Sequence, residues 1–222
     1  MITTQTPLNQ LLPPREAPGN SRPLLVVSGC LLGEPVRYDG GDKSLGSLRD
    51  LLQANLRLHS VCPEVYAGMG TPRPPVQWVA TSGGDDLQRV EDPAISAREL
   101  LLDGCQKWVD SWQGEAPVAA LLKARSPSCG NGTTPLLDEA GELLRYRDGA
   151  FVETLKRRWP QLWIIDEESI DSKADVLWLC RLLQWRQFNH RAGESLLALL
   201  ALEPAQRLAW WQQHGHQGKP DL

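Results

Sequence analysis

The chain of 222 residues is long enough to bury one large core, or one domain with an appendage. Its formal net charge of -4 and its pI of about 5.6 argue against a protein that binds duplex nucleic acid through a basic face. No stretch has the pattern of a targeting peptide or of a membrane-spanning helix, and the number of cysteines, five, is odd, so we expect a cytoplasmic protein with reduced thiols.

The first half of the chain alternates between short apolar runs and loops that contain glycine and proline. Residues 1–22 are rich in Pro, Asn and Thr without a period, which predicts a flexible arm. Beyond this arm, hydrophobic spacing predicts a buried strand at 24–27, a helix at 44–56 capped by Ser44, a strand at 58–61, and a hairpin formed by 76–81 and 87–90.

The second half of the chain contains longer helical patterns. Apolar spacing predicts a helix within 92–112, and Ser96 with Glu99 forms a capping box at its start. Further elements follow as a strand at 116–124, an edge strand at 141–146, a helix at 147–159, a strand at 160–166, and amphipathic helices after 172.

Strands that alternate with helices are typical of the α/β class. We therefore expect a mostly parallel open sheet flanked by helices, in a Rossmann-like arrangement, with a C-terminal helical extension. The expected organisation is a flexible arm at 1–22, an α/β domain at 23–171 and the helical extension at 172–222. The oligomeric state is left open.

Three of the five cysteines directly follow a predicted strand. Cys30, Cys62 and Cys129 each lie beside Pro or Gly at the carboxyl end of a strand, and such ends share one edge of an open parallel sheet. The three side chains can therefore meet, either as a shared metal or cluster site or as unrelated small residues. Cys105 and Cys180 lie inside amphipathic helices, which predicts ordinary core packing.

Three thiolates restrict what such a site can hold. Structural zinc usually takes four ligands with paired cysteines, and the chain has no C-x-x-C pair. His59 is a poor fourth ligand, because on an extended strand it faces away from Cys62. A 4Fe–4S cluster on three thiolates retains one iron without a protein ligand, and soft thiolates favour iron–sulfur over hard cations. A metal-free nucleophilic or redox cysteine is the remaining alternative.

Three short motifs in a fixed order carry a family resemblance. They are VVSGCLLGEPVRYDGGDK around Cys30, VCPEV followed by TPRPP around Cys62, and LKARSPSCG around Cys129. From about Leu24 to about Glu168 the chain resembles the thiouracil desulfidases, a bacterial family long described as a domain of unknown function. The resemblance implies an oxygen-sensitive 4Fe–4S cluster on these cysteines and a small-molecule substrate with a C=S group, such as 2-thiouracil or a thionucleoside.

The resemblance also implies a hydrolytic reaction and two catalytic residues. In this family the substrate sulfur binds the fourth iron, and hydrolysis of the carbon releases sulfide without net redox change. The catalytic carboxylate falls on Glu64, which can deprotonate water, and the catalytic serine falls on Ser126, which can stabilise charge on the ring. The alternatives are a loop carboxylate paired with Arg73 and a turn hydroxyl bonded to its own backbone.

Four more polar residues are expected at the substrate. Ser28 and Ser128 could bond cluster sulfurs or substrate carbonyls. Lys123 could offset the charge of the cluster, or reach solvent from the end of its strand. Asp39, together with Arg37, Tyr38 and Lys43, could close the pocket or belong to a salt-bridged surface loop.

Two features depart from the family pattern and bear on substrate choice. Gln77 stands where the family usually carries Glu, and residues 131–146 lack the Tyr-Asp-Gly-Thr-Phe pattern that commonly follows the third cysteine. The acidic pI favours a free thiobase or thionucleoside over nucleic acid. The competing function is an iron–sulfur or sulfur-trafficking module that binds without turnover.

Overall fold

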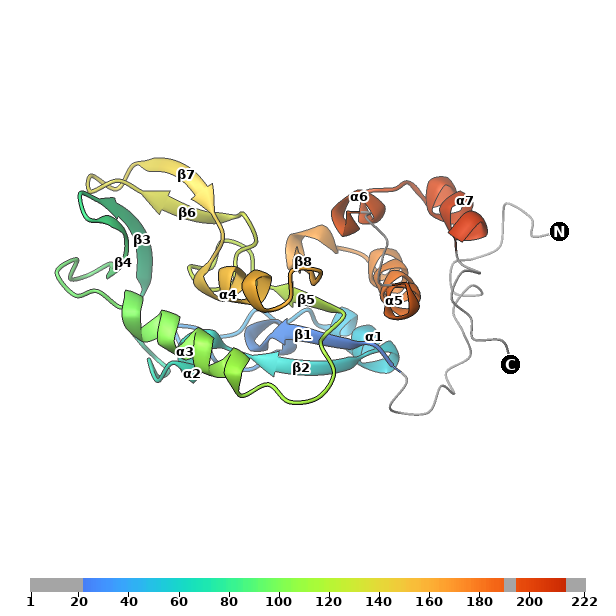
Figure 1. Ribbon diagram of the computed structural model, residues 1–222, viewed down its shortest axis with the longest axis horizontal. Helices are drawn as coiled ribbons and strands as arrows, with labels where there is room; N and C mark the ends of the chain where they lie inside the picture. Colours follow the sequence, from blue (N-terminus) through green and yellow to red (C-terminus); the bar gives the residue numbers. More distant parts are fainter. Residues whose placement is uncertain (1–21, 190–194, 215–222) are drawn as a thin grey trace.

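The first sheet of the molecule is fully parallel, with the strand order β2-β1-β5-β8 (Figure 1). The computed structural model describes residues 22–189 and 195–214. The strands are β1 Leu24–Ser28, β2 Arg57–Val61, β5 Ala119–Leu122 and β8 Trp163–Asp166. Leu25 of β1 pairs with Leu58 of β2 on one side and with Ala119 of β5 on the other. The carboxyl ends of these strands therefore form one edge of the sheet.

Helices cover both faces of this sheet, which confirms the predicted α/β class. Leu25 and Val27 of β1 face one apolar cluster and Val26 faces another, as the alternation of a strand requires. The first cluster includes residues of α1, α5, α6 and α7, and the second includes residues of α3 and α4. The helices are α1 Ser47–Asn55, α3 Arg98–Asp110, α4 Ala150–Arg158, α5 Lys173–Phe188, α6 Leu196–Leu200 and α7 Pro204–His214.

A second, mixed sheet has the strand order β4-β3-β6-β7. Its strands are β3 Val76–Thr81, β4 Gly84–Arg89, β6 Thr134–Leu137 and β7 Leu143–Arg147. The predicted hairpin and edge strand are confirmed as β3–β4 and β7. Strand β6 was not predicted, because it is short and contains Pro135, which is typical of loops and sheet edges. It joins the two hairpins by pairing in parallel with β3.

Both predicted helix caps are wrong. The N-cap of α1 is Gly46, and the Ser44 hydroxyl instead accepts a bond from the Gly46 N–H at 3.2 Å. The Ser96 hydroxyl donates to Asp86 at 2.6 Å and accepts from the N–H of Arg98, where α3 begins, so no capping box forms. Short hydroxyl side chains bond the nearest partner in a turn, and the sequence pattern therefore placed both helix starts too early.

The structure describes the predicted α/β domain but only part of the predicted arm and of the C-terminal extension. Residues 1–21 of the expected arm lie outside the described part of the chain. The extension begins as expected, with Ser172 as the N-cap of α5, while the domain division itself stays a prediction. In residues 22–189 and 195–214, no helix has the length and apolar character needed to cross a membrane.

Candidate active site

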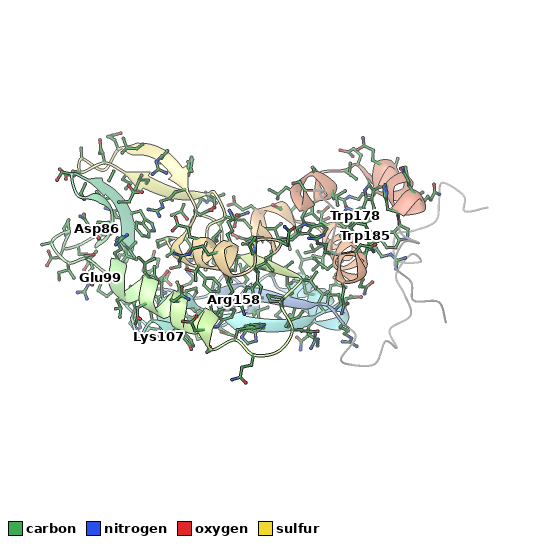
Figure 2. All side chains as sticks on the ribbon, viewed as in Figure 1. Asp86, Glu99, Lys107, Arg158, Trp178 and Trp185 are labelled. Carbon is green, nitrogen blue, oxygen red and sulfur yellow. The ribbon has the colours of Figure 1, made fainter. Side chains whose placement is uncertain are left out.

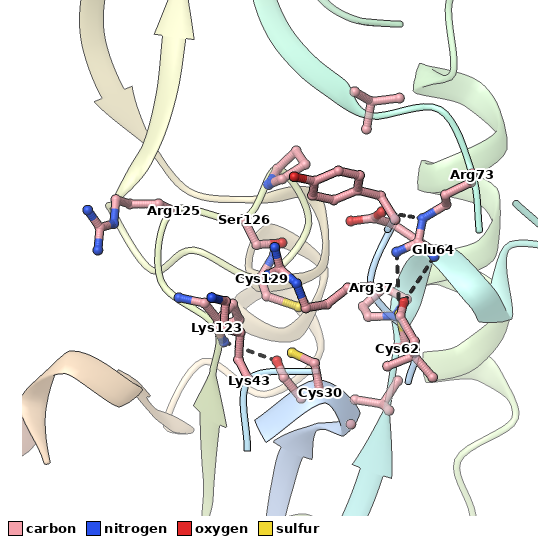
Figure 3. Close-up of a pocket in the computed structure, with 18 of the residues that line it drawn as sticks. Cys30, Arg37, Lys43, Cys62, Glu64, Arg73, Lys123, Arg125, Ser126 and Cys129 are labelled. Carbon is pink, nitrogen blue, oxygen red and sulfur yellow. Dashed lines mark hydrogen bonds and ion pairs between the residues drawn. The ribbon is translucent and has the colours of Figure 1, made fainter. Parts of the chain in front are cut away.

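Three cysteines meet at the carboxyl edge of the parallel sheet (Figure 3). Cys30 follows β1 in a short 3-10 turn, Gly29–Leu32. Cys62 directly follows β2, and Cys129 lies in the loop after β5. All three line one cavity of about 360 Å³, and Figure 3 shows the sulfur atoms of Cys30 and Cys129 facing the same space. The parallel register thus brings together thiols that are far apart in sequence.

The three thiols hold their protons in the absence of metal. Burial raises the pKa of Cys30 to about 11, and the neighbouring Cys62 adds to the rise. Burial also raises the pKa of Cys62. The pKa of Cys129 is raised well above its usual value by burial, and a hydrogen bond with Ser28 opposes this rise. A metal or cluster that binds these groups must therefore displace their protons.

Glu64 is the one acid among the residues that line the cavity, and both of its carboxylate oxygens are bonded. It lies on the short helix α2 (Pro63–Tyr66), two residues after Cys62, and is 9% exposed. Arg73 donates to Oε2 through Nε at 2.7 Å, and Ser128 donates to Oε1 at 2.6 Å. The pairing with Arg73 that the sequence left as an alternative is therefore present.

Ser126 also lines the cavity, from the loop that carries Cys129. Its hydroxyl oxygen accepts bonds from the N–H groups of Ser128 and Cys129, each at 3.2 Å. These are the turn bonds that the sequence left as an alternative. They engage the lone pairs of the oxygen, which leaves the hydroxyl proton as the remaining hydrogen-bonding group of this side chain.

Basic side chains surround the thiols. The cations that line the cavity are Arg37, Lys43, Arg73, Lys123 and Arg125. Of these, Lys123 forms an ion pair with Glu167 and Arg125 with Glu168, just after β8. Arg73 pairs with Glu64 and Arg37 lies 3.5 Å from Asp39, so carboxylates in or beside the cavity balance most of this positive charge.

Comparison with known proteins identifies the family. A family model described as 2-thiouracil desulfurase matches residues 25–167, more than half of the chain. The chain belongs to the 2-thiouracil desulfurase family. The resemblance predicted from the three cysteine motifs is therefore confirmed.

Two individual proteins are also similar to this desulfurase. The structure of the [4Fe-4S]-dependent thiouracil desulfidase TudS aligns with a TM-score of 0.54 and 28% identity, covering 67% of this chain and 93% of that chain. The uncharacterized protein YbbK of Bacillus subtilis is 31% identical over 113 residues, which are 49% of this chain and 74% of YbbK. Both matches leave a substantial part of the present chain without a counterpart.

Of the four residues expected to contact the substrate of this desulfurase, two line the cavity and two do not. Ser28 and Lys123 line the cavity, and the backbone N–H of Lys123 donates to the Ser28 hydroxyl at 3.0 Å. Ser128 is fully buried and does not line the cavity. Asp39 is exposed outside the cavity, where it accepts a bond from Gly41 and lies 3.5 Å from Arg37. This is the surface-loop arrangement that the sequence left as an alternative.

The structure gives positions near the cavity to residues whose roles the sequence motifs did not predict. The sequence indicates Arg73 only as a partner of Glu64, whereas in the structure Arg73 also lines the cavity. Trp78 is 2% exposed and donates to the carbonyl of Pro127 at 2.9 Å, so it supports the loop beneath the site. His59 packs against Trp112, with 4.7 Å between the centroids of two tilted rings, and does not line the cavity, as its strand position predicted.

Proposed function

We propose that this chain hydrolyses the C=S bond of 2-thiouracil or a related thionucleoside to C=O, with release of sulfide. The observation that carries this proposal is the convergence of three thiols on one cavity beside a buried carboxylate. Family membership supports thiouracil desulfuration as the class of reaction. The structural relative described as [4Fe-4S]-dependent supports an iron–sulfur cofactor.

The donor set fits a 4Fe–4S cluster held by Cys30, Cys62 and Cys129. The lining residues offer three soft sulfur donors and no histidine. Within residues 22–189 and 195–214, no three His, Cys, Asp or Glu side chains are close enough to hold a single metal ion. When bound through three thiolates, such a cluster supplies a Lewis-acidic iron that can bind and polarise the substrate sulfur.

The side chains around the cavity supply the proton transfers. Glu64 accepts a proton from the attacking water, because a carboxylate in hydrogen-bond reach makes water a better nucleophile. Ser126 donates its hydroxyl proton to the ring as negative charge develops there. Lys123, which also pairs with Glu167, and the other cavity cations offset part of the charge of the thiolates and of the departing hydrosulfide. Water provides the oxygen of the product, so the reaction needs no electron donor.

The experiment that tests the proposal combines cofactor analysis with one substitution. Protein purified without oxygen is expected to contain iron and sulfide and to release sulfide from 2-thiouracil. Glu64→Gln is expected to keep its iron and to lose roughly 10²–10⁴-fold in kcat, the usual contribution of a general base. Glu99→Gln, an exposed position on α3, serves as the matched control with unchanged kcat. Iron-free protein that releases no sulfide from any thiobase would contradict the proposal.

One observation favours a second function, a module that carries a cluster or sulfide without turnover. Both oxygens of Glu64 already have protein partners, as in a purely structural carboxylate. This alternative predicts that Glu64→Gln retains its iron and that neither form of the protein turns over thiobases. Measuring iron content and kcat on the same preparations therefore separates the two functions.

A further inference from the structure

Glu64 is held from two sides by residues that come from different loops. Ser128 belongs to the cysteine loop after β5, and its hydroxyl donates to Oε1 at 2.6 Å. Arg73 belongs to the loop after α2, and its Nε donates to Oε2 at 2.7 Å. Ser128 is 0% exposed and Arg73 is 8% exposed, so both bonds are shielded from water. Hydrogen bonds to a charged group in such surroundings are short, strong and directional.

Ser128 is placed to act on Glu64 and not on a substrate. It does not line the cavity, whereas Glu64 does. Its backbone is fixed as well, because its N–H donates to Ser126 and its carbonyl accepts from the N–H of Phe151 at 2.9 Å. The hydroxyl therefore approaches the carboxylate from a rigid loop, and the substrate-binding role predicted for Ser128 does not match this position.

Arg73 connects Glu64 to two other parts of the site. Its Nη1 donates to the carbonyls of Val36 at 3.0 Å and Gly70 at 2.8 Å. Its Nη2 lies 3.9 Å from the sulfur of Cys62. The planar fork of a guanidinium can make all these contacts together, whereas the single ammonium of a lysine cannot.

We propose that Ser128 and Arg73 are positioning residues that fix the carboxylate of Glu64 for proton transfer. This inference rests on the proposed function, in which Glu64 is the general base. With one bond on each oxygen, the carboxylate cannot rotate, and the remaining lone pairs keep a fixed direction toward the cavity. A displacement of about 1 Å in a reacting group can cost about 10²-fold in rate, so this restraint contributes directly to kcat.

The first test is Ser128→Ala in the full-length, cluster-loaded protein. We expect kcat to fall about 10- to 100-fold while KM changes less than about 3-fold, because only the orientation of the base is lost. Iron content per chain and equilibrium binding of uracil are expected to match the wild type. Thr154→Val is the matched control, because it removes another buried hydroxyl, on α4, that does not line the cavity. A rise in KM with unchanged kcat would instead assign Ser128 to substrate binding and overturn the inference.

A double-mutant cycle shows whether Ser128 acts through Glu64. In the Glu64→Gln background, Ser128→Ala is expected to cause no further loss of kcat, because the group that it positions is already gone. An equal fold-loss in both backgrounds overturns the inference while leaving Glu64 as the base. If Glu64→Gln alone keeps the wild-type kcat, the proposed function itself fails and the inference falls with it.

Arg73→Lys provides an independent variant. It keeps the positive charge and loses the fork, so we expect a lower kcat with nearly unchanged KM and iron content. Arg207→Lys is the control for the general cost of replacing a buried arginine, since Arg207 is 7% exposed and pairs with Asp175 at 2.7 Å in the C-terminal helices. If both lysine variants retain the wild-type kcat, Arg73 does not position the base.

Discussion

Charge and donor type determine what the residues of the cavity can bind. The thiols of Cys30, Cys62 and Cys129 share one cavity with basic side chains, and Glu64 is the one lining acid. Three buried thiolates this close together would repel one another, and nearby cations reduce this electrostatic repulsion. The identities of the cysteines and of Glu64 were predicted from motifs. The bond from Ser128 to Glu64 was not, because it joins residues that no local pattern connects.

The cysteine set can be tested one residue at a time. Replacing Cys30, Cys62 or Cys129 by Ser is expected to lower the iron content of anaerobically purified protein, because a hydroxyl is a harder and weaker ligand for iron than a thiolate. Cys105→Ala and Cys180→Ala are the controls, since both thiols are 0% exposed within the apolar clusters. Full iron content in any of the three serine variants would remove that cysteine from the ligand set.

Among the elements, the first turn of α4 holds the cysteine loop in place. The N–H groups of Gly149, Ala150 and Phe151 donate to loop carbonyls, those of Gly130, Pro127 and Ser128 respectively. These N–H groups have no partners within the helix, so the loop and the helix end satisfy each other. The sequence predicted the helix, but not that its start would bind the loop that carries Cys129.

Gly149 makes this approach possible. A Cβ at Gly149 would lie 2.4 Å from the carbonyl carbon of Ser128, while the φ of -71° is ordinary for any residue. Gly149→Ala is therefore expected to displace the loop and to destabilise the protein by about 1–3 kcal/mol. Hydrogen exchange at the amides of Ser128 and Cys129 is expected to accelerate. Gly83→Ala, whose Cβ would be no closer than 3.8 Å to a neighbour, is the control. Unchanged exchange at the loop would contradict this account.

Over the whole molecule, the C-terminal helices complete the core of the parallel sheet. The family match ends at residue 167, before α5 begins. Even so, residues of α5, α6 and α7 share one apolar cluster with β1, β5 and β8. Trp178 of α5 donates to the carbonyl of Leu199 at 2.8 Å, and Figure 2 shows its ring among these helices together with that of Trp185. We therefore expect the extension and the sheet to unfold together.

Trp178→Ala tests this expectation. Trp178 is 1% exposed, and removal of a large buried aromatic side chain is expected to cost about 3–5 kcal/mol of unfolding free energy. Urea unfolding is expected to remain a single transition when followed by far-UV circular dichroism and by hydrogen exchange in β1. Trp178→Phe, which keeps most of the apolar area, is expected to lose less. Two separate transitions would show that the extension folds as its own domain.

The sequence by itself determined the α/β class, most strands and helices, and the cysteines at the strand ends, because hydrophobic periodicity and strand polarity are local properties. Only the tertiary structure decided that Asp39 lies outside the cavity, that β6 joins two hairpins, and that Ser128 bonds Glu64. Each of these depends on which distant segments come into contact. The packing of the whole chain decides those contacts, and no spacing within a single segment encodes them.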